Sequence, residues 1–403
     1  MMQHRIDSLD VLRALCALGV LAAHLFGETE GLGSHPLLTG LASFGVESVI
    51  GFFVLSGCVI ALQPYAGQAP YLRARAVRIL PIYYIVLAGC IALMLWTREP
   101  FKATELLGNL FFVQNLFWRP VRPLDFFFSS WSLNYELYYY LGFLLVMARP
   151  RLLLPFATIS LLTGIGLYWL PHQGPHMLVL HPLSLWCLWL VGAWIAGRVD
   201  RGAAAPSLAT AAWVMALAIC LSRLPWNFSE ENKFDFGRLL GFGIGFAAVA
   251  WALLDTERRR TAPTAPAPIE VGLPLRLALT AGVLALLWSR SHSFVTTKIE
   301  IAAVVVAATI VPGAVVVLVA WGLRPLLPSL RYVSGLSYGL YLVHYPVLQF
   351  SNRVAVDVSP YLRIAGVAAL SFGLAHLLEY RLQPWLRRRL RPTPAPTPSA
   401  ATS

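Results

Sequence analysis

Two side chains in an apolar segment near the N-terminus could do chemistry inside a membrane. Arg13 and His24 lie eleven residues apart in LDVLRALCALGVLAAHLFG. Eleven steps of about 100° return to nearly the same helix face, roughly 16 Å along the axis. A cation at one end of this stripe and a titratable base toward the other suit a path across a membrane. In the simpler alternatives, Arg13 only reaches the headgroups and His24 only hydrogen bonds a neighbouring helix. The cost of an imidazole in hydrocarbon favours a functional role for His24.

A second candidate is a pair of arginines. Arg75 and Arg78 stand at i and i+3 in YLRARAVRIL, so they share a face of any helix that begins there. Two guanidinium groups on one face form a fork that binds phosphate oxygens. Basic residues also gather at the cytoplasmic ends of spans, and spacing alone favours this simpler explanation.

Ionisable side chains also lie in two tyrosine-rich segments. Glu136 lies in WSLNYELYYY beside Tyr135 and Tyr138, and His344 lies in LSYGLYLVHYPVL near Tyr341. A buried carboxylate or imidazole needs hydrogen-bond partners, which tyrosine or histidine would supply. The tyrosines could equally form an interfacial aromatic belt.

Composition determines which elements must position these groups. Of the 403 residues, 58% are hydrophobic and only 12% are charged, and the mean hydropathy is +0.66. A soluble core cannot hide so much apolar surface. At roughly 20 residues per span, the chain predicts an all-α, polytopic transmembrane bundle of about 10–12 spans, with one membrane domain over residues 1–391.

Apolar runs of membrane length divide the chain into twelve candidate spans. They lie near 9–27, 41–62, 79–96, 130–147, 152–170, 178–197, 206–222, 238–254, 272–289, 300–323, 333–351 and 361–383. The apolar stretch 105–118 is short and suits a re-entrant or interfacial segment.

The positive charges follow the predicted topology. A cytoplasmic N-terminus places most arginines between spans on the cytoplasmic side, as the positive-inside rule requires. Both termini are cytoplasmic if the number of spans is even, in a bacterial-type inner (plasma) membrane. The net charge of +12 therefore reflects contact with the lipid bilayer, and no nucleic-acid partner is expected.

Three further features bound the organisation. Proline-rich low-complexity sequence predicts a flexible cytoplasmic linker near 255–271 and a disordered tail over 392–403. The five cysteines are odd in number and lie in apolar stretches without CxxC spacing. Neither a disulfide framework nor a metal site is expected.

These motifs, in this order, resemble the membrane acyltransferase-3 family, which transfers acyl groups from acyl-CoA to sugars of surface glycans. The likeness rests on the segment with Arg13 and His24, GFFVLSGCVI at 51–60, YLRARAVRILPIYY, WSLNYELYYY and the closing LSYGLYLVHYPVL. It spans most of the chain. The form WSLNYELYYY is most similar to the exopolysaccharide-modifying branch.

The resemblance implies roles for these residues. His24 would be the catalytic base, and Arg13, Arg75 and Arg78 would hold the acyl-CoA donor, with the last two on its phosphates. Contacts to the sugar are expected from the tyrosines and histidine of the two later motifs, which are Tyr135, Tyr138, Tyr341 and His344. The thioester is already activated, so acetyl-CoA is the expected co-substrate and no metal is required.

The chain departs from the family pattern at one position. The family often has an acid two residues before the Phe-Phe of FFVLSG, and Ile50 stands there instead. Glu47, three residues earlier, shares its helical face. The acidic partner of His24 is therefore expected to be either Glu47 or Glu136.

The expected function is transfer of an acyl group, with acetyl the first candidate, from cytoplasmic acyl-CoA to a hydroxyl of an extracytoplasmic or lipid-linked glycan. Direct transfer and a transient acyl-histidine fit the residues equally. A transporter or channel for a substituted sugar or acyl group is the alternative, because intramembrane His, Glu and Arg also mark transport paths.

Overall fold

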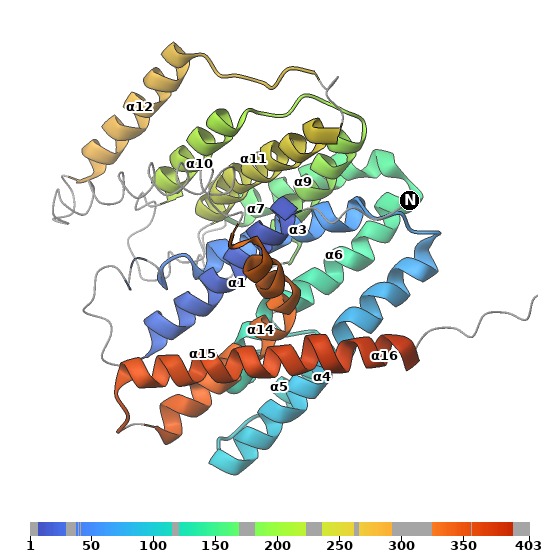
Figure 1. Ribbon diagram of the computed structural model, residues 1–403, viewed down its shortest axis with the longest axis vertical. Helices are drawn as coiled ribbons and strands as arrows, with labels where there is room; N and C mark the ends of the chain where they lie inside the picture. Colours follow the sequence, from blue (N-terminus) through green and yellow to red (C-terminus); the bar gives the residue numbers. More distant parts are fainter. Residues whose placement is uncertain are drawn as a thin grey trace, which may run out of the picture.

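The described part of the chain is an assembly of helices (Figure 1). The computed structural model describes residues 7–29, 38, 40, 42–114, 121–168, 182–222, 236–261, 266–291, 325–355 and 357–389. Among these residues, β pairing is limited to two isolated bridges, Gln114 with Val121 and Pro206 with Ile269. The predicted all-α class is confirmed.

The helices follow one another in chain order with short connections. The first half holds α1 (Asp7–Glu28), α3 (Gly45–Ala61), α4 (Gln68–Thr97), α5 (Ala103–Leu110), η1 (Asp125–Ser130), α6 (Trp131–Ala148), η2 (Pro150–Leu152) and α7 (Leu153–Tyr168). The second half holds α9 (Pro182–Asp200), α10 (Leu208–Ser222), α11 (Phe236–Thr261), α12 (Leu273–Ser291), α14 (Leu327–Val354), α15 (Pro360–His376), η5 (Leu377–Leu382) and α16 (Gln383–Arg389).

Eleven of the twelve predicted spans overlap a helix, and the span at 300–323 lies outside the described residues. Five helices are long and apolar enough to cross a membrane, and four shorter helices are also apolar. The polytopic architecture predicted from hydropathy is therefore present.

Two predicted boundaries differ from the structure. The third span was expected from residue 79, but α4 begins at Gln68 and is 30 residues long. The arginines of YLRARAVRIL therefore lie on the helix. The predicted flexible linker near 255–271 is also partly ordered. Helix α11 continues to Thr261, and the backbone of Ile269 exchanges hydrogen bonds of 2.8 and 3.0 Å with Ala205 and Ser207.

Two glycines set the closest helix contact near the GFFVLSG motif. A Cβ atom on Gly57 of α3 would lie 1.9 Å from the carbonyl oxygen of Trp189, and one on Gly192 of α9 would lie 2.0 Å from that of Val54. Only glycine at both positions permits the two backbones to touch. This packing fixes one face of α3 and leaves Ser56 on another.

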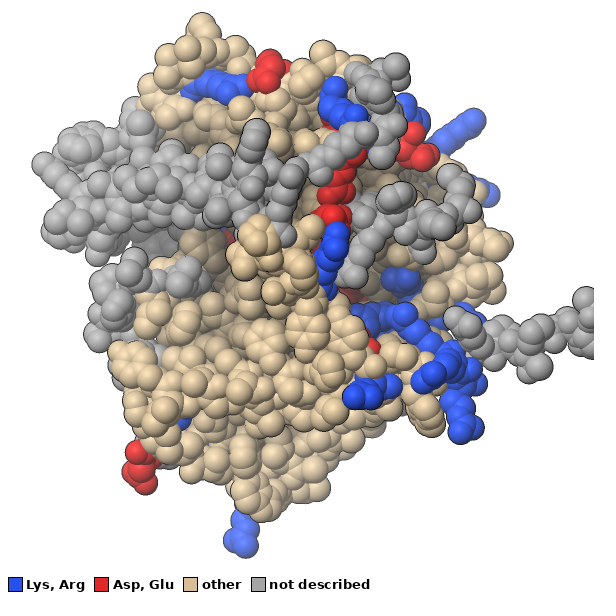
Figure 2. All heavy atoms as spheres, in the orientation of Figure 1, with Lys and Arg blue, Asp and Glu red and all other residues tan. Residues whose placement is uncertain are grey.

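The last helices form one wall of the bundle. Helices α15 and α16 are joined through η5, a turn of π-helix, into a nearly continuous rod from Pro360 to Arg389 (Figure 1). Helix α15 packs along α14. Figure 2 shows basic side chains gathered where α16 ends, while the surface over α15 carries almost no charge. The rod therefore has one polar end and a long apolar flank.

Candidate functional site

A cavity lies between the helices that carry the sequence motifs. Its volume is about 680 Å³, and residues of α1, α3, α4, α6, α14 and α16 line it, together with Gln63 of the turn before α4. Ligand pockets commonly measure roughly 300–1,000 Å³. The cavity is therefore large enough for a cofactor-sized molecule.

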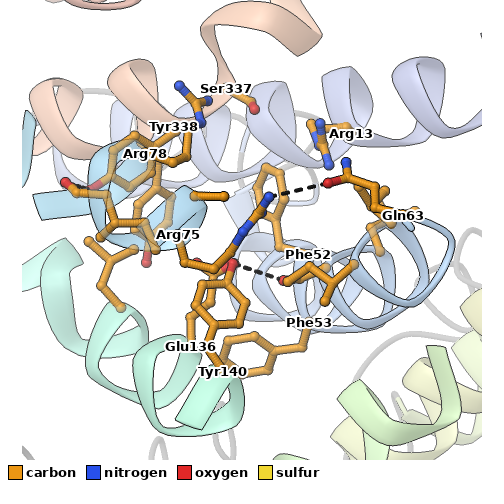
Figure 3. Close-up of a pocket in the computed structure, with 18 of the residues that line it drawn as sticks. Arg13, Phe52, Phe53, Gln63, Arg75, Arg78, Glu136, Tyr140, Ser337 and Tyr338 are labelled. Atoms are coloured by element: carbon orange, nitrogen blue, oxygen red, sulfur yellow. Dashed lines mark hydrogen bonds between the residues drawn. The ribbon is translucent and has the colours of Figure 1, made fainter. Parts of the chain in front are cut away.

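Five arginines and one glutamate are the charged residues of this lining. The arginines come from three separate helices and are Arg13, Arg73, Arg75, Arg78 and Arg387. In Figure 3, Arg75 occupies the middle of the cavity, with Arg13 on one side and Arg78 on the other. We call this space the arginine cavity. Its charge suits an anion with several negative groups.

Arg75 is held in the cavity by the turn before α4. Its Nη2 donates to Oε1 of Gln63 at 3.3 Å, and its guanidinium lies 5.9 Å from the ring centre of Tyr65. The Tyr65 hydroxyl donates to the same Gln63 oxygen at 2.8 Å. Burial raises the pKa of Tyr65, although the positive charge of Arg75 opposes the shift. The phenol therefore stays a neutral donor.

Arg78 has two partners from the C-terminal helices. Its Nη1 donates to Oε2 of Glu379, whose side chain is 3% exposed. The guanidinium also lies 5.3 Å from the ring centre of Tyr338. A carboxylate and an aromatic face both stabilise a guanidinium.

Glu136 lies on the wall of the arginine cavity with a hydroxyl on each side. Its Oε1 accepts a hydrogen bond from Ser56 of the GFFVLSG motif at 2.8 Å and another from the Tyr140 hydroxyl. Ser56 and Tyr140 are themselves 3.1 Å apart. Three residues from α3 and α6 thus form one hydrogen-bonded group facing the arginines (Figure 3).

His24 does not line the arginine cavity. Its Nδ1 lies 2.7 Å from Oε1 of Glu28, one helical turn further along α1. Gln349 donates to the other Glu28 oxygen at 2.8 Å, and Asn352 donates to the Glu28 carbonyl at 3.2 Å. A carboxylate on Nδ1 fixes the ring orientation and leaves Nε2 as the reactive nitrogen.

Two aromatic side chains of α14 stand between His24 and the arginine cavity. Tyr341 lines the cavity, and its ring centre is 6.0 Å from that of His344. The His344 ring in turn is 5.1 Å from His24. Nδ1 of His344 bonds the Leu340 carbonyl at 2.9 Å, whereas its buried Nε2 has no partner among the described residues. The predicted open path is thus interrupted by a wall two rings thick.

The acid beside His24 is neither of the two that were expected. Glu47 is fully buried and accepts hydrogen bonds from Arg238 of α11, one of them 2.9 Å long. Its position in the first turn of α3 directs it toward α11 and away from α1. Glu136 bonds the hydroxyls of α3 and α6, as described above. Glu28 takes the place beside His24, and its i+4 spacing was the available signal.

Two predicted substrate residues lie outside the cavity lining. Tyr135 is fully buried against Phe53 and Trp131, at ring distances of 6.4 and 5.7 Å. The hydroxyl of Tyr138 donates to the Phe112 carbonyl at 2.7 Å. Both point away from the α6 face that presents Glu136, since neighbouring helix positions do not share a face.

Several residues of the site were not foreseen as site residues. Glu28 extends the first motif by one turn, and Ser56 and Tyr140 belong to motifs that the sequence already marks. Arg387 and Glu379 reach the arginines from about 300 residues further along the chain, so no local pattern indicates them. Within the described residues, no group of three or more His, Cys, Asp or Glu side chains is placed to hold a metal.

Comparison with protein families gives one match. A family model described as an acyltransferase domain matches residues 6–380, which is nearly the whole chain. Comparison with curated proteins and with solved structures found no match. The match includes every motif and every cavity-lining residue except Arg387.

Proposed function

Because the chain belongs to this acyltransferase family, we propose that it moves an acyl group, acetyl in the first instance, from cytoplasmic acyl-CoA to a sugar hydroxyl. The acceptor is an extracytoplasmic or lipid-linked glycan, and an exopolysaccharide fits the form of the motif at 131–140. Its apolar helices make the chain a multi-pass membrane protein, so donor and acceptor can reach it from opposite sides.

The observation that carries the proposal is the set of five arginines around one cavity. Coenzyme A carries a 3′-phosphate and a diphosphate, and guanidinium groups bind such oxygens in pairs. With both termini in the cytoplasm, the arginine end of α4 faces the compartment that holds acyl-CoA. The pantetheine arm would then run between the helices toward Tyr341.

The reacting groups lie beyond the tyrosine. His24 would accept the proton of the sugar hydroxyl on Nε2, while Glu28 holds Nδ1 and stabilises the imidazolium. The hydroxyl oxygen attacks the thioester carbonyl, the C–S bond breaks, and the thiolate leaves with the proton from His24. An acyl-histidine formed first on Nε2 would give the same products.

The wall of Tyr341 and His344 must move for this reaction. In the structure it separates the arginine cavity from His24. Rotation of these side chains on donor binding would join the two compartments, as happens in enzymes that complete their site on closure. His344 would then lie beside both the thioester and the base, in agreement with its expected contact to substrate.

An assay of the purified protein tests the proposal. Labelled acetyl-CoA with a surface-glycan acceptor should release free CoA and label the glycan. His24→Ala should abolish both signals, since no other base is placed to replace it. His376→Ala is the matched control, because that imidazole is exposed and bonds only Tyr332 at 2.9 Å among the described residues.

The alternative of transport without acyl-CoA chemistry predicts a different result. A wild-type protein that consumes no acyl-CoA with any glycan, yet moves a labelled substituted sugar into vesicles, would replace the enzyme proposal.

A further inference from the structure

The C-terminal rod supplies the buried counter-charge of Arg78. Glu379 lies in η5, and its Oε2 accepts the hydrogen bond from Nη1 of Arg78. Its side chain is 3% exposed, whereas that of Arg78 is 25% exposed. The carboxylate is thus on the protein side of the guanidinium, and the cavity is on the other.

The geometry of Glu379 is fixed by α14. Its Oε1 accepts the backbone N–H of Gly339 at 3.0 Å. A Cβ atom at Gly339 would lie only 3.0 Å from Cγ of Glu379 and 3.4 Å from Ala375. Any larger residue at this position would therefore push the carboxylate. Single π-turns inside helices often occur at functional sites, because they redirect a side chain.

The same rod contributes a cation to the cavity. Gln383 donates to the Val77 carbonyl of α4 at 2.8 Å, which fixes the start of α16 against the arginine motif. One turn further, Arg387 joins the cavity lining. Residues 379–387 therefore act on the arginine cavity as a unit.

We propose that Glu379 is a positioning residue for donor binding: it fixes the guanidinium of Arg78 so that its remaining N–H groups face the phosphates of the donor. This inference rests on the proposed function. A carboxylate behind a ligand-binding side chain fixes its orientation at little cost, since the pair is already desolvated together. Tyr338 restricts the guanidinium from a second direction.

Binding of coenzyme A to the purified full-length chain tests the role. Glu379→Gln keeps the shape but removes the charge, and it should weaken CoA binding about tenfold, the lower end of what carboxylates behind metal-bound histidines contribute. The kcat for acyl transfer should stay near the wild-type value while KM for acetyl-CoA rises. Glu270→Gln is the matched control, because this acid also pairs with an arginine, Arg276, at 2.6 Å, away from the cavity.

Gly339→Ala is a second variant that changes no charge. Its methyl group displaces Glu379, so it should also weaken CoA binding, by about threefold on the same scale. Adding Glu379→Gln to Arg78→Ala should leave the affinity of the single Arg78→Ala variant unchanged, because the positioned group is then absent. This cycle separates positioning from general destabilisation, and it still gives a result if one of the single variants folds poorly.

The outcomes distinguish the two proposals. If the wild type binds no CoA, the donor site falls, and the role of Glu379 falls with it. If the wild type binds CoA and Glu379→Gln binds equally well or more tightly, the donor site stands and the positioning role is wrong. Tighter binding would mean that Glu379 competes with the phosphates for Arg78.

Discussion

At the scale of single residues, the site consists of side chains that hold one another in place. Glu28 holds His24, Gln63 holds Arg75, and the hydroxyls of α3 and α6 hold Glu136. Each partner limits the rotamers of the functional group, which raises the precision of the site. The sequence predicted the functional members from their cost in hydrocarbon. It could not predict most of the partners, because a partner is a property of the packed structure.

Glu28→Gln should lower kcat about 100-fold, within the range that general base catalysis contributes. A glutamine amide can donate to Nδ1 and so favour the wrong imidazole tautomer. Steady-state release of CoA measures the effect, and KM for acetyl-CoA should change little because Glu28 lies outside the arginine cavity. A Glu28→Gln enzyme with wild-type kcat would show that the carboxylate does not act on His24.

Arg75→Ala should raise KM for acetyl-CoA about tenfold or more, because a charge-assisted hydrogen bond contributes about 1.5–3 kcal/mol. Acetyl-pantetheine lacks the phosphates, so its KM should be the same for the variant and the wild type. Arg276→Ala serves as the control, since Arg276 bonds Glu270 outside the cavity. Equal losses with both donors would place the phosphates elsewhere.

At the scale of helices, hydropathy was sufficient to locate the spans but not their polar ends. Helix α4 begins eleven residues before the expected start because Gln68–Arg78 continues the helix beyond its apolar part. A window that counts apolar residues cannot detect such an extension. Helix contacts were also hidden, since the touching backbones of α3 and α9 depend on two glycines 135 residues apart.

Gly57→Ala should lower the midpoint of thermal unfolding in detergent, because its methyl group meets a backbone carbonyl at 1.9 Å that cannot move aside. Overpacking of this kind costs about 1–3 kcal/mol. Gly89→Ala in α4 is the control, since nothing lies within 4 Å of a Cβ there. Alanine in a helix interior is about 0.5–1 kcal/mol better than glycine, so this variant should be at least as stable as the wild type. Equal midpoints for both variants would contradict the close approach of α3 and α9.

At the scale of the whole molecule, the site joins helices from both ends of the chain. Arg13 of α1 and Arg387 of α16 line one cavity, although the sequence separates them by almost its full length. The sequence motifs predicted most members of the cavity through resemblance to a family, and hydropathy predicted the class of fold. Neither indicated the wall between the cavity and His24, because ring contacts depend on how α1 and α14 pack.

Orientation in the membrane follows from the charges and can be measured by thiol labelling. Ala66 and Lys102 are exposed residues just beyond the opposite ends of α4. Ala66→Cys should react with a membrane-impermeant maleimide only after cells are permeabilised, whereas Lys102→Cys should react in intact cells. The five native thiols are all buried, so the unsubstituted chain should give little background. The opposite pattern would place the arginine cavity outside and exclude a cytoplasmic donor.

The wall of Tyr341 and His344 also bears on the ion gradients of the cell. A water-filled passage lined with arginine and histidine would conduct anions or protons, and a membrane that leaks either loses its stored potential. With the two rings packed between the compartments, the resting protein is electrically tight, and an idle enzyme also keeps outside water from hydrolysing the thioester. Evolution of such a catalyst is thus constrained twice, by the reaction and by the need to insulate.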